Sequence, residues 1–478
     1  MATLDIRIDR ERVTKGDEFA VAIAIPPQPS DRTASSEFVL ALDASQSMTW
    51  PARNSQEGLT RWDLARRGAL ALVASLNPTV DMHILLFSGN SRVVAAARAD
   101  TLHAELEGLL PITLEEDFSG TDIGKALQTS YGLLDTSNAT SRRVVLLSDG
   151  DPTVGNCSPA HLAGVAKGAG TRDIYTDPIG LGAEANVDLL LQLSGTGACD
   201  HVASRAEADH VMSEIMSRLA EGGQQVAASG GELRLEVSPF FSVVGVYQLM
   251  PAKRTFSNAI TSGTEGATKI DIALGAIGSG EARPVFALKL RAPSRTSAAP
   301  LPLLRPTATI RRRRGSVQLT GPEVTIWSVS DRDTSPDPQI LQQIRAVEFE
   351  AKTATRLRSA NAELHEQVYV EAEQEARSIG LSELADQYLD ALVALRSGLD
   401  ANDVRNEQRA TSSRSTTTPR SILRERPVLA PSSRQRPAQR NLIFSHADWT
   451  DDPTDKTPSP KDRVADREPT DTDYGDPW

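Results

Sequence analysis

The sequence predicts an α/β fold with a doubly wound, mainly parallel sheet, joined to an all-β sandwich, a small helical unit and a disordered tail. Strands and helices alternate over residues 36–222, which indicates a parallel sheet covered by helices. Short strands separated by Gly, Pro and Ser follow at 230–330, and helical periodicity follows at 337–400. The polar segment 408–478 has too few apolar residues to form a core.

Residues 1–30 contain an alternating strand and an apolar strand separated by a turn at 14–17, which predicts a β-hairpin. A hairpin does not fit a parallel sheet. We therefore expect it to join the sandwich, so that the α/β domain is inserted in the sandwich or followed by it. Within the α/β domain, residues 61–76 and 121–134 are predicted helices, the second with Thr121 as its N-cap.

Composition sets limits on partners and location. The net charge of −12 argues against nucleic acid as the default partner. No apolar run approaches the ~18 residues that would cross a bilayer, and the N-terminus has no apolar signal core. These features predict a cytoplasmic protein without a membrane segment.

The two cysteines, Cys157 and Cys199, are expected to be free thiols, with a disulfide as the alternative. His161 and His201 lie near them and could complete a zinc site, but neither spacing is a standard zinc pair. We interpret the proximity as coincidence and place His201 on the surface.

Three separate motifs carry side-chain oxygens at predicted strand or helix ends. Asp43, Ser45 and Ser47 follow the apolar strand 38–42 on alternate residues. Thr121 follows a glycine at the start of a helix, and Asp149 follows a second apolar strand and precedes a glycine. Loops at the carboxyl ends of strands in a doubly wound sheet meet in one crevice, so these five residues can converge on a hard cation.

In these motifs the sequence resembles the von Willebrand factor A family, whose metal-ion-dependent adhesion site has the same pattern. The resemblance covers about residues 36–222 and implies that Asp43, Ser45, Ser47, Thr121 and Asp149 hold Mg²⁺ or Mn²⁺. It also implies an open coordination position for an Asp or Glu of a protein partner. Insertion of such a domain in a sandwich is familiar in this family, and the implied setting is that of an intracellular bacterial protein.

We expect a noncatalytic adaptor that captures a protein partner through this metal site, beside a kinase, a phosphatase or an ATPase. The alternative is a structural assembly component whose ion serves stability alone. Enzyme classes fit poorly, because Ser45 stands where a haloacid-type phosphatase needs a second Asp, and Ala126 stands where a P-loop needs Ser or Thr.

Two charged segments allow further interpretations. The run Arg311–Arg314 could bind phosphate, nucleic acid or an acidic partner, but a solvated hairpin end in the sandwich is the preferred interpretation. In the tail, Thr416, Thr417 and Thr418 lie among arginines and are possible phosphosites, which a phosphopeptide reader could recognise. The apolar island 441–449 could be a docking motif.

Overall fold

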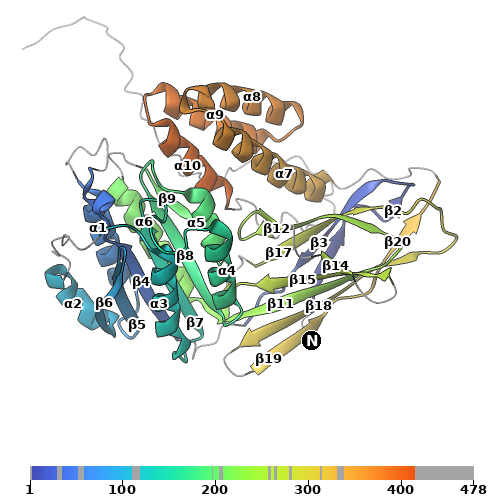
Figure 1. Cartoon of the computed structure of the whole chain (residues 1–478). Coiled ribbons are helices and arrows are strands. Elements are labelled where there is room, and N and C mark those ends of the chain that lie inside the picture. Colours follow the sequence, from blue (N-terminus) through green and yellow to red (C-terminus); the bar gives the residue numbers. More distant parts are fainter. Residues whose placement is uncertain are drawn as a thin grey trace, which may run out of the picture. The chain divides into compact units, whose positions relative to one another are not determined.

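The computed structural model describes residues 3–29, 35–51, 59–109, 119–195, 197–203, 208–256, 260–262, 266–278, 283–312, 315–330 and 338–414 (Figure 1). These residues belong to one compact unit, residues 1–425. The possible phosphosites Thr416–Thr418 and the island 441–449 lie outside the described residues. None of the described helices has the length and apolar character needed to cross a membrane.

The predicted doubly wound α/β fold is confirmed. A six-stranded sheet has the order β6-β5-β4-β7-β8-β9 and is parallel except for β6, which runs antiparallel to β5. Its strands are β4 (Ser36–Asp43), β5 (Asp81–Phe87), β6 (Ser91–Arg98), β7 (Ser141–Ser148), β8 (Ile174–Leu181) and β9 (Asp200–Val202). Its helices are η1 (Gln46–Thr49), α1 (Arg61–Ser75), α2 (Ala99–Leu109), α3 (Ile123–Asp135), α4 (Pro159–Gly170), α5 (Val187–Leu193) and α6 (Ala208–Gln224).

Strand β4 lies in the middle of this sheet and is buried on both faces, which explains its continuous apolar sequence. Successive side chains point to opposite faces. Leu40 and Leu42 pack in the core that includes α1 and α6, while Val39 and Ala41 pack in the core that includes α3 and α5. Burial on both faces fixes the end of β4, where the first predicted motif begins.

The second domain is a sandwich of mainly antiparallel strands that the α/β domain interrupts, in which only the short β2 pairs in parallel, with β20, among the described strands. Its sheets have the orders β1-β3-β17-β12-β13 and β14-β15-β11-β18-β20-β2, with β19 beside β18 and a small β10-β16 pair. Strand β3 pairs with β17, so the first strands of the chain lie in a sheet with strands from beyond residue 230. The strands are β1 (Asp5–Ile8), β2 (Arg12–Val13), β3 (Glu18–Ala24), β10 (Val226–Ala228), β11 (Gly230–Val237), β12 (Ser242–Met250), β13 (Arg254–Thr255), β14 (Ile260–Ser262), β15 (Thr268–Leu274), β16 (Ile277–Gly278), β17 (Val285–Arg291), β18 (Leu301–Arg312), β19 (Gly315–Thr320) and β20 (Val324–Ser328).

The helical unit contains α7 (Pro338–Ser359), η3 (Ala362–Leu364), α8 (His365–Ser378), α9 (Ser382–Arg396) and α10 (Ala401–Ser412). Its core includes the fully buried rings of Tyr369 and Tyr388. We predicted that this unit ends at 400 and that the tail begins at 408, but α10 begins directly after the first limit and continues past the second. The reason is packing, because Val404 is buried in the helical core and Ala410 is buried against the α/β domain.

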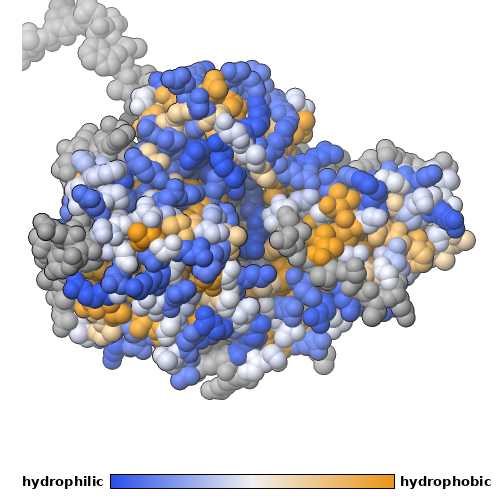
Figure 2. Space-filling model, viewed as in Figure 1, coloured by the Kyte–Doolittle hydropathy of each residue, from blue (hydrophilic) through white to orange (hydrophobic). Residues whose placement is uncertain are grey.

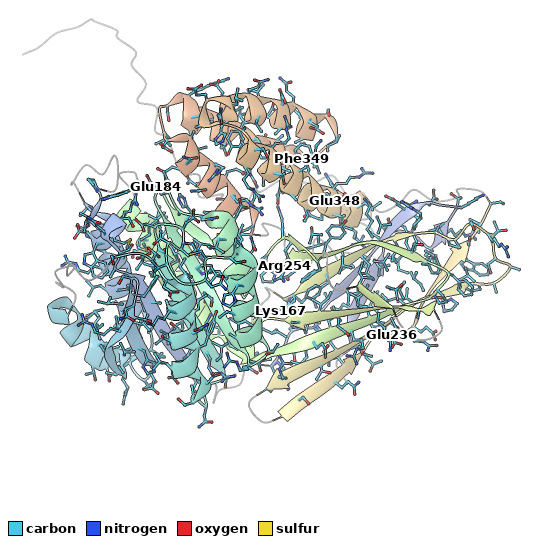
Figure 3. All side chains as sticks on the ribbon, viewed as in Figure 1. Lys167, Glu184, Glu236, Arg254, Glu348 and Phe349 are labelled. Carbon is cyan, nitrogen blue, oxygen red and sulfur yellow. The ribbon has the colours of Figure 1, made fainter. Side chains whose placement is uncertain are left out.

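Helix α7 fixes the helical unit to the sandwich. Ile340 and Ile344 pack on the small side chains of β3 and β17. Glu348 accepts a hydrogen bond from the Tyr247 hydroxyl at 2.6 Å, and Lys253 pairs with the buried Glu350 at 2.8 Å. Apolar residues gather elsewhere on the visible face of the sandwich, whereas hydrophilic residues cover much of the helical unit (Figure 2). Figure 3 shows Glu348 on α7.

The described half of the arginine run, Arg311 and Arg312, is not simply a solvated hairpin end, and Arg313 and Arg314 lie outside the described residues. The Arg311 guanidinium donates to Asp173 of the α/β domain, with a shortest distance of 2.6 Å, and Ser229 donates to the same carboxylate at 3.0 Å. Arg312 donates to Gln28. The sequence could not reveal this, because Asp173 lies far from the run and reaches it only through domain packing.

Candidate metal centre

Asp43 is the last residue of β4, and its side chain is fully buried. Its Oδ1 accepts a hydrogen bond from the Ser45 amide at 2.9 Å, and its Oδ2 accepts one from the Ser148 hydroxyl at 2.7 Å. The two contacts come from the loop after β4 and from the neighbouring strand β7. The orientation of this carboxylate is therefore set before any ligand arrives.

The hydroxyls of Ser45 and Ser47 lie 3.1 Å apart on the same loop. Ser47 Oγ donates to Asp149 Oδ1 at 2.9 Å. Asp149 directly follows β7, the neighbour of β4 in the sheet. The structure thus brings four of the five predicted residues together at the carboxyl ends of two parallel strands.

Thr121 reaches the same edge through backbone contacts. Its amide donates to Thr153 Oγ1 at 2.8 Å, and its carbonyl accepts from the Thr153 amide at 2.9 Å. The preceding Gly120 has φ +82°, a left-handed conformation that residues other than glycine rarely adopt. These contacts tie Thr121 to the loop that follows Asp149. Among the described residues, no side-chain hydrogen bond joins Thr121 to the other four.

The predicted N-cap role of Thr121 is wrong. Helix α3 begins at Ile123, and the side chain of Asp122 accepts from the Lys125 amide at 2.8 Å. Asp122 therefore caps the helix. Thr121 lies one residue earlier, where its hydroxyl does not serve a helix end.

Two charged residues that the sequence analysis missed complete the cluster. Arg61, the first residue of α1, is 3 % exposed, and its Nη1 donates to Asp149 Oδ2 at 2.5 Å. Its Nη2 donates to Glu184, and its guanidinium lies 5.5 Å from the centre of the Trp50 ring. No spacing rule points to Arg61, because both carboxylates that it contacts are distant in the sequence.

The charges in this cluster suit a divalent cation. Asp43, Asp149 and Glu184 supply three carboxylates and Arg61 one guanidinium, which leaves a net charge of −2 when all are ionised. Burial, together with the nearby Asp149 carboxylate, raises the pKa of Asp43 to about 7. A bound cation would favour the ionised form. Carboxylate and hydroxyl oxygens in this arrangement fit Mg²⁺ or Mn²⁺.

The cysteines do not form a second centre. Cys157 and Cys199 are free, and burial raises the pKa of the Cys199 thiol to about 12. In the described part of the chain, no three His, Cys, Asp or Glu side chains are grouped so that they could hold a metal ion by themselves, so the candidate centre depends on hydroxyl oxygens as well as on carboxylates. The prediction that His201 lies on the surface is wrong. Its ring is buried, with Nε2 2.9 Å from the carbonyl of Gly182, which follows β8, and 3.8 Å from Asp403 Oδ1 of α10.

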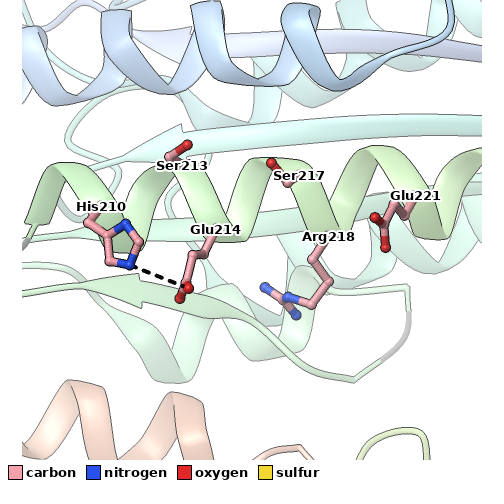
Figure 4. Close-up of a pocket in the computed structure, with 6 residues that line it drawn as sticks. All are labelled: His210, Ser213, Glu214, Ser217, Arg218 and Glu221. Carbon is pink, nitrogen blue, oxygen red and sulfur yellow. Dashed lines mark ion pairs between the residues drawn. The ribbon is translucent and has the colours of Figure 1, made fainter. Parts of the chain in front are cut away.

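A shallow hollow runs along the outer face of α6, away from the predicted metal ligands (Figure 4). His210 Nε2 lies 3.4 Å from Glu214 Oε1, and Arg218 donates to Asp200 at 2.8 Å. The side chains that line this hollow all come from one helix, so the hollow has no second wall of side chains and carries no candidate site.

Comparisons with known proteins agree with the fold of the α/β domain. Residues 38–151 match the sequence model of the von Willebrand factor type A domain, so the chain contains a domain of this family. A von Willebrand factor type A structure from Catenulispora acidiphila has 16 % identity and a TM-score of 0.67, with 87 % of this chain and 98 % of that chain covered.

The ArnB paralog VWA2 from Sulfolobus acidocaldarius also has 16 % identity, with a TM-score of 0.53 and coverage of 87 % and 99 %. These likenesses extend beyond the α/β domain, so the arrangement of domains is itself a shared fold. A search of curated protein sequences finds no match.

Proposed function

We propose that this protein is a noncatalytic adaptor whose α/β domain binds a protein partner through a divalent cation and an Asp or Glu of that partner. The observation that carries the proposal is the row of oxygens from Ser45 and Ser47 to Asp149, beside the buried Asp43. Von Willebrand factor A domains are generally interaction modules, which supports a binding role.

The chain's own residues would divide the work. Asp43 and Asp149 supply charge, while Ser45, Ser47 and Thr121 supply neutral oxygens. When bound, Mg²⁺ or Mn²⁺ would offer an electrophilic position to an incoming carboxylate. Ser148 donates a hydrogen bond to Asp43, and hydrogen bonds of this kind orient the side chains that bind a metal. A place beside a kinase, phosphatase or ATPase is carried by the resemblance alone, and a cytoplasmic location by the sequence features described above.

The first test measures metal binding to the full chain by Mn²⁺ electron paramagnetic resonance. Wild type should bind one Mn²⁺ at this centre, and Asp43→Ala should lose it. Asp81→Ala is the matched control, because Asp81 is an exposed aspartate at the amino end of β5, on the same sheet but at its opposite edge. Equal Mn²⁺ binding by wild type and Asp43→Ala would refute the metal centre.

The second test asks for carboxylate recognition. Immobilised peptides that differ only by Glu or Gln at one position are probed with the protein in Mg²⁺ and in EDTA. Binding that needs both Mg²⁺ and the Glu side chain supports the adaptor. Strong thermal stabilisation by Mg²⁺ with no Glu-dependent binding would instead favour the structural component, in which the ion serves stability alone.

A further inference from the structure

The loop between β8 and α5, residues 182–186, reaches the metal centre through Glu184. This carboxylate accepts a hydrogen bond from Arg61, which also donates to Asp149. Arg61 would on its own cancel the charge of Asp149 and weaken the attraction for a divalent ion. Glu184 restores that charge, so its position on Arg61 determines what the centre offers to a cation.

Asn186, at the end of the same loop, makes a second contact with the metal motif. Its side-chain amide donates to Asp151 Oδ1, and its Oδ1 caps α5 by accepting from the Leu189 amide at 3.0 Å. The loop therefore contacts the segment 149–151 directly through Asn186 and indirectly, through Arg61, by way of Glu184. A displacement of the loop would loosen both contacts.

The opposite side of the loop is held by α10 of the helical unit. Asn406 is 2 % exposed, and its Nδ2 donates to the carbonyls of Ala183 at 3.2 Å and Ala185 at 2.9 Å. These two carbonyls flank Glu184 in the chain. A single buried amide thus fixes the backbone on both sides of the residue that engages Arg61. Figure 3 shows Glu184 on the side of the α/β domain that faces α10.

Helix α10 is itself held in place by contacts of its own residues and of the two residues that follow it. Arg409 donates to Asp188 of α5 at 3.3 Å, and Arg414 contacts Asp200 of β9. The Ser413 carbonyl accepts from the Lys253 amide of the sandwich at 2.8 Å. The position of Asn406 therefore depends on how the helical unit, the sandwich and the α/β domain are assembled.

We propose that Asn406 is a positioning residue of the metal centre: by holding the β8–α5 loop, it keeps Glu184 on Arg61 and so maintains the affinity for a divalent cation. This inference rests on the proposed function. Partners that support metal ligands from outside typically change affinity by 10–100-fold when they are removed. We therefore expect Asn406→Ala to weaken Mn²⁺ binding by roughly tenfold.

The test compares Mn²⁺ affinities of the full chain in wild type, Asn406→Ala, Glu184→Gln and the double variant. Thr411→Ala is the control, because Thr411 is exposed on the same helix. Both single variants should weaken binding, the double variant should bind no more weakly than Glu184→Gln, and the control should match wild type. Effects of the two variants that simply add would overturn the inference, because they would mean that Asn406 acts independently of Glu184.

A second measurement needs no variant. Coupling between two sites is reciprocal, so Mn²⁺ should slow amide hydrogen exchange in α10 as well as in the loop. Unchanged hydrogen exchange in α10 would overturn the inference. An Asn406→Ala variant with wild-type Mn²⁺ affinity and a lowered melting temperature in EDTA would overturn it too, because it would show a structural role only. Mn²⁺ binding that is insensitive to Asp43→Ala would overturn the proposed metal centre and this inference together.

Discussion

Replacing Arg61 by Met tests whether the buried guanidinium and a bound cation act on the same carboxylate, that of Asp149. Arg61 and Asp149 are 3 % and 1 % exposed, and their atoms lie 2.5 Å apart. Met keeps an apolar stem but removes the charge, so Asp149 is left near Asp43 without its cation. Breaking a buried ion pair in this way typically costs about 3–5 kcal/mol, which we expect for Arg61→Met in EDTA.

The same substitution should strengthen metal binding, because the centre then carries one more net negative charge. A ligand present at a hundred times its dissociation constant stabilises the folded state by about 2.7 kcal/mol. Saturating Mg²⁺ should therefore bring the variant close to the stability that wild type has in EDTA. The gain from Mg²⁺ should be larger in the variant than in wild type.

Urea unfolding in EDTA and in Mg²⁺ measures both quantities for each protein. Arg67→Met is the control, because Arg67 lies on the same helix and pairs with Asp209 at 2.6 Å, but both side chains are at least one-third exposed. Its cost should stay below about 1 kcal/mol, with or without metal. A variant Arg61→Met that loses stability equally in EDTA and in Mg²⁺ would refute the argument that Arg61 and the cation act on the same carboxylate.

Two further substitutions test a buried carboxyl group in the sandwich and a glycine with positive φ in the α/β domain. Burial raises the pKa of Asp9 to about 6, so its protonated form favours folding and stability is lost as pH rises from about 4 to 6. Urea unfolding at pH 4 and pH 7.5 should therefore show that the free energy of unfolding of Asp9→Asn, relative to wild type, is up to about 3 kcal/mol higher at pH 7.5 than at pH 4. The same pH dependence in both proteins would contradict the raised pKa of Asp9. Gly155 has φ +75°, and a Cβ there would lie 2.4 Å from Asp122 Oδ2. Gly155→Ala should lower stability by about 2 kcal/mol or more in thermal unfolding, while the control Gly164→Ala, in open space on α4, should not; equal melting temperatures would count against the strain.

The sequence was sufficient to predict the α/β fold and the elements that carry the candidate centre. Strand β4 is an uninterrupted apolar run because both of its faces are buried, and this pattern is visible in the residues themselves. The carboxyl ends of parallel strands must meet at one edge, so the convergence of Asp43 and Asp149 followed from topology.

The contacts that depend on distant pairing could not be predicted in this way. Arg61 occupies the first turn of a helix, where a charged residue is ordinarily exposed, and only the assembled domain shows that it is buried between Asp149 and Glu184. Asn406 has no sequence signal either, because its partners are backbone carbonyls. Helix α10 is polar in composition, and its order comes from packing on two domains rather than from its own residues.

The pairing of β3 with β17 has a consequence for how the chain folds. Glu18 lies opposite Arg291, so this strand pair closes only after the intervening chain has been made. The α/β domain between them is built from neighbouring elements and can become compact first, which brings the two distant strands within reach. During synthesis, the edge of β3 that pairs with β17 therefore stays unpaired until β17 has been made, although β3 is among the first strands to leave the ribosome.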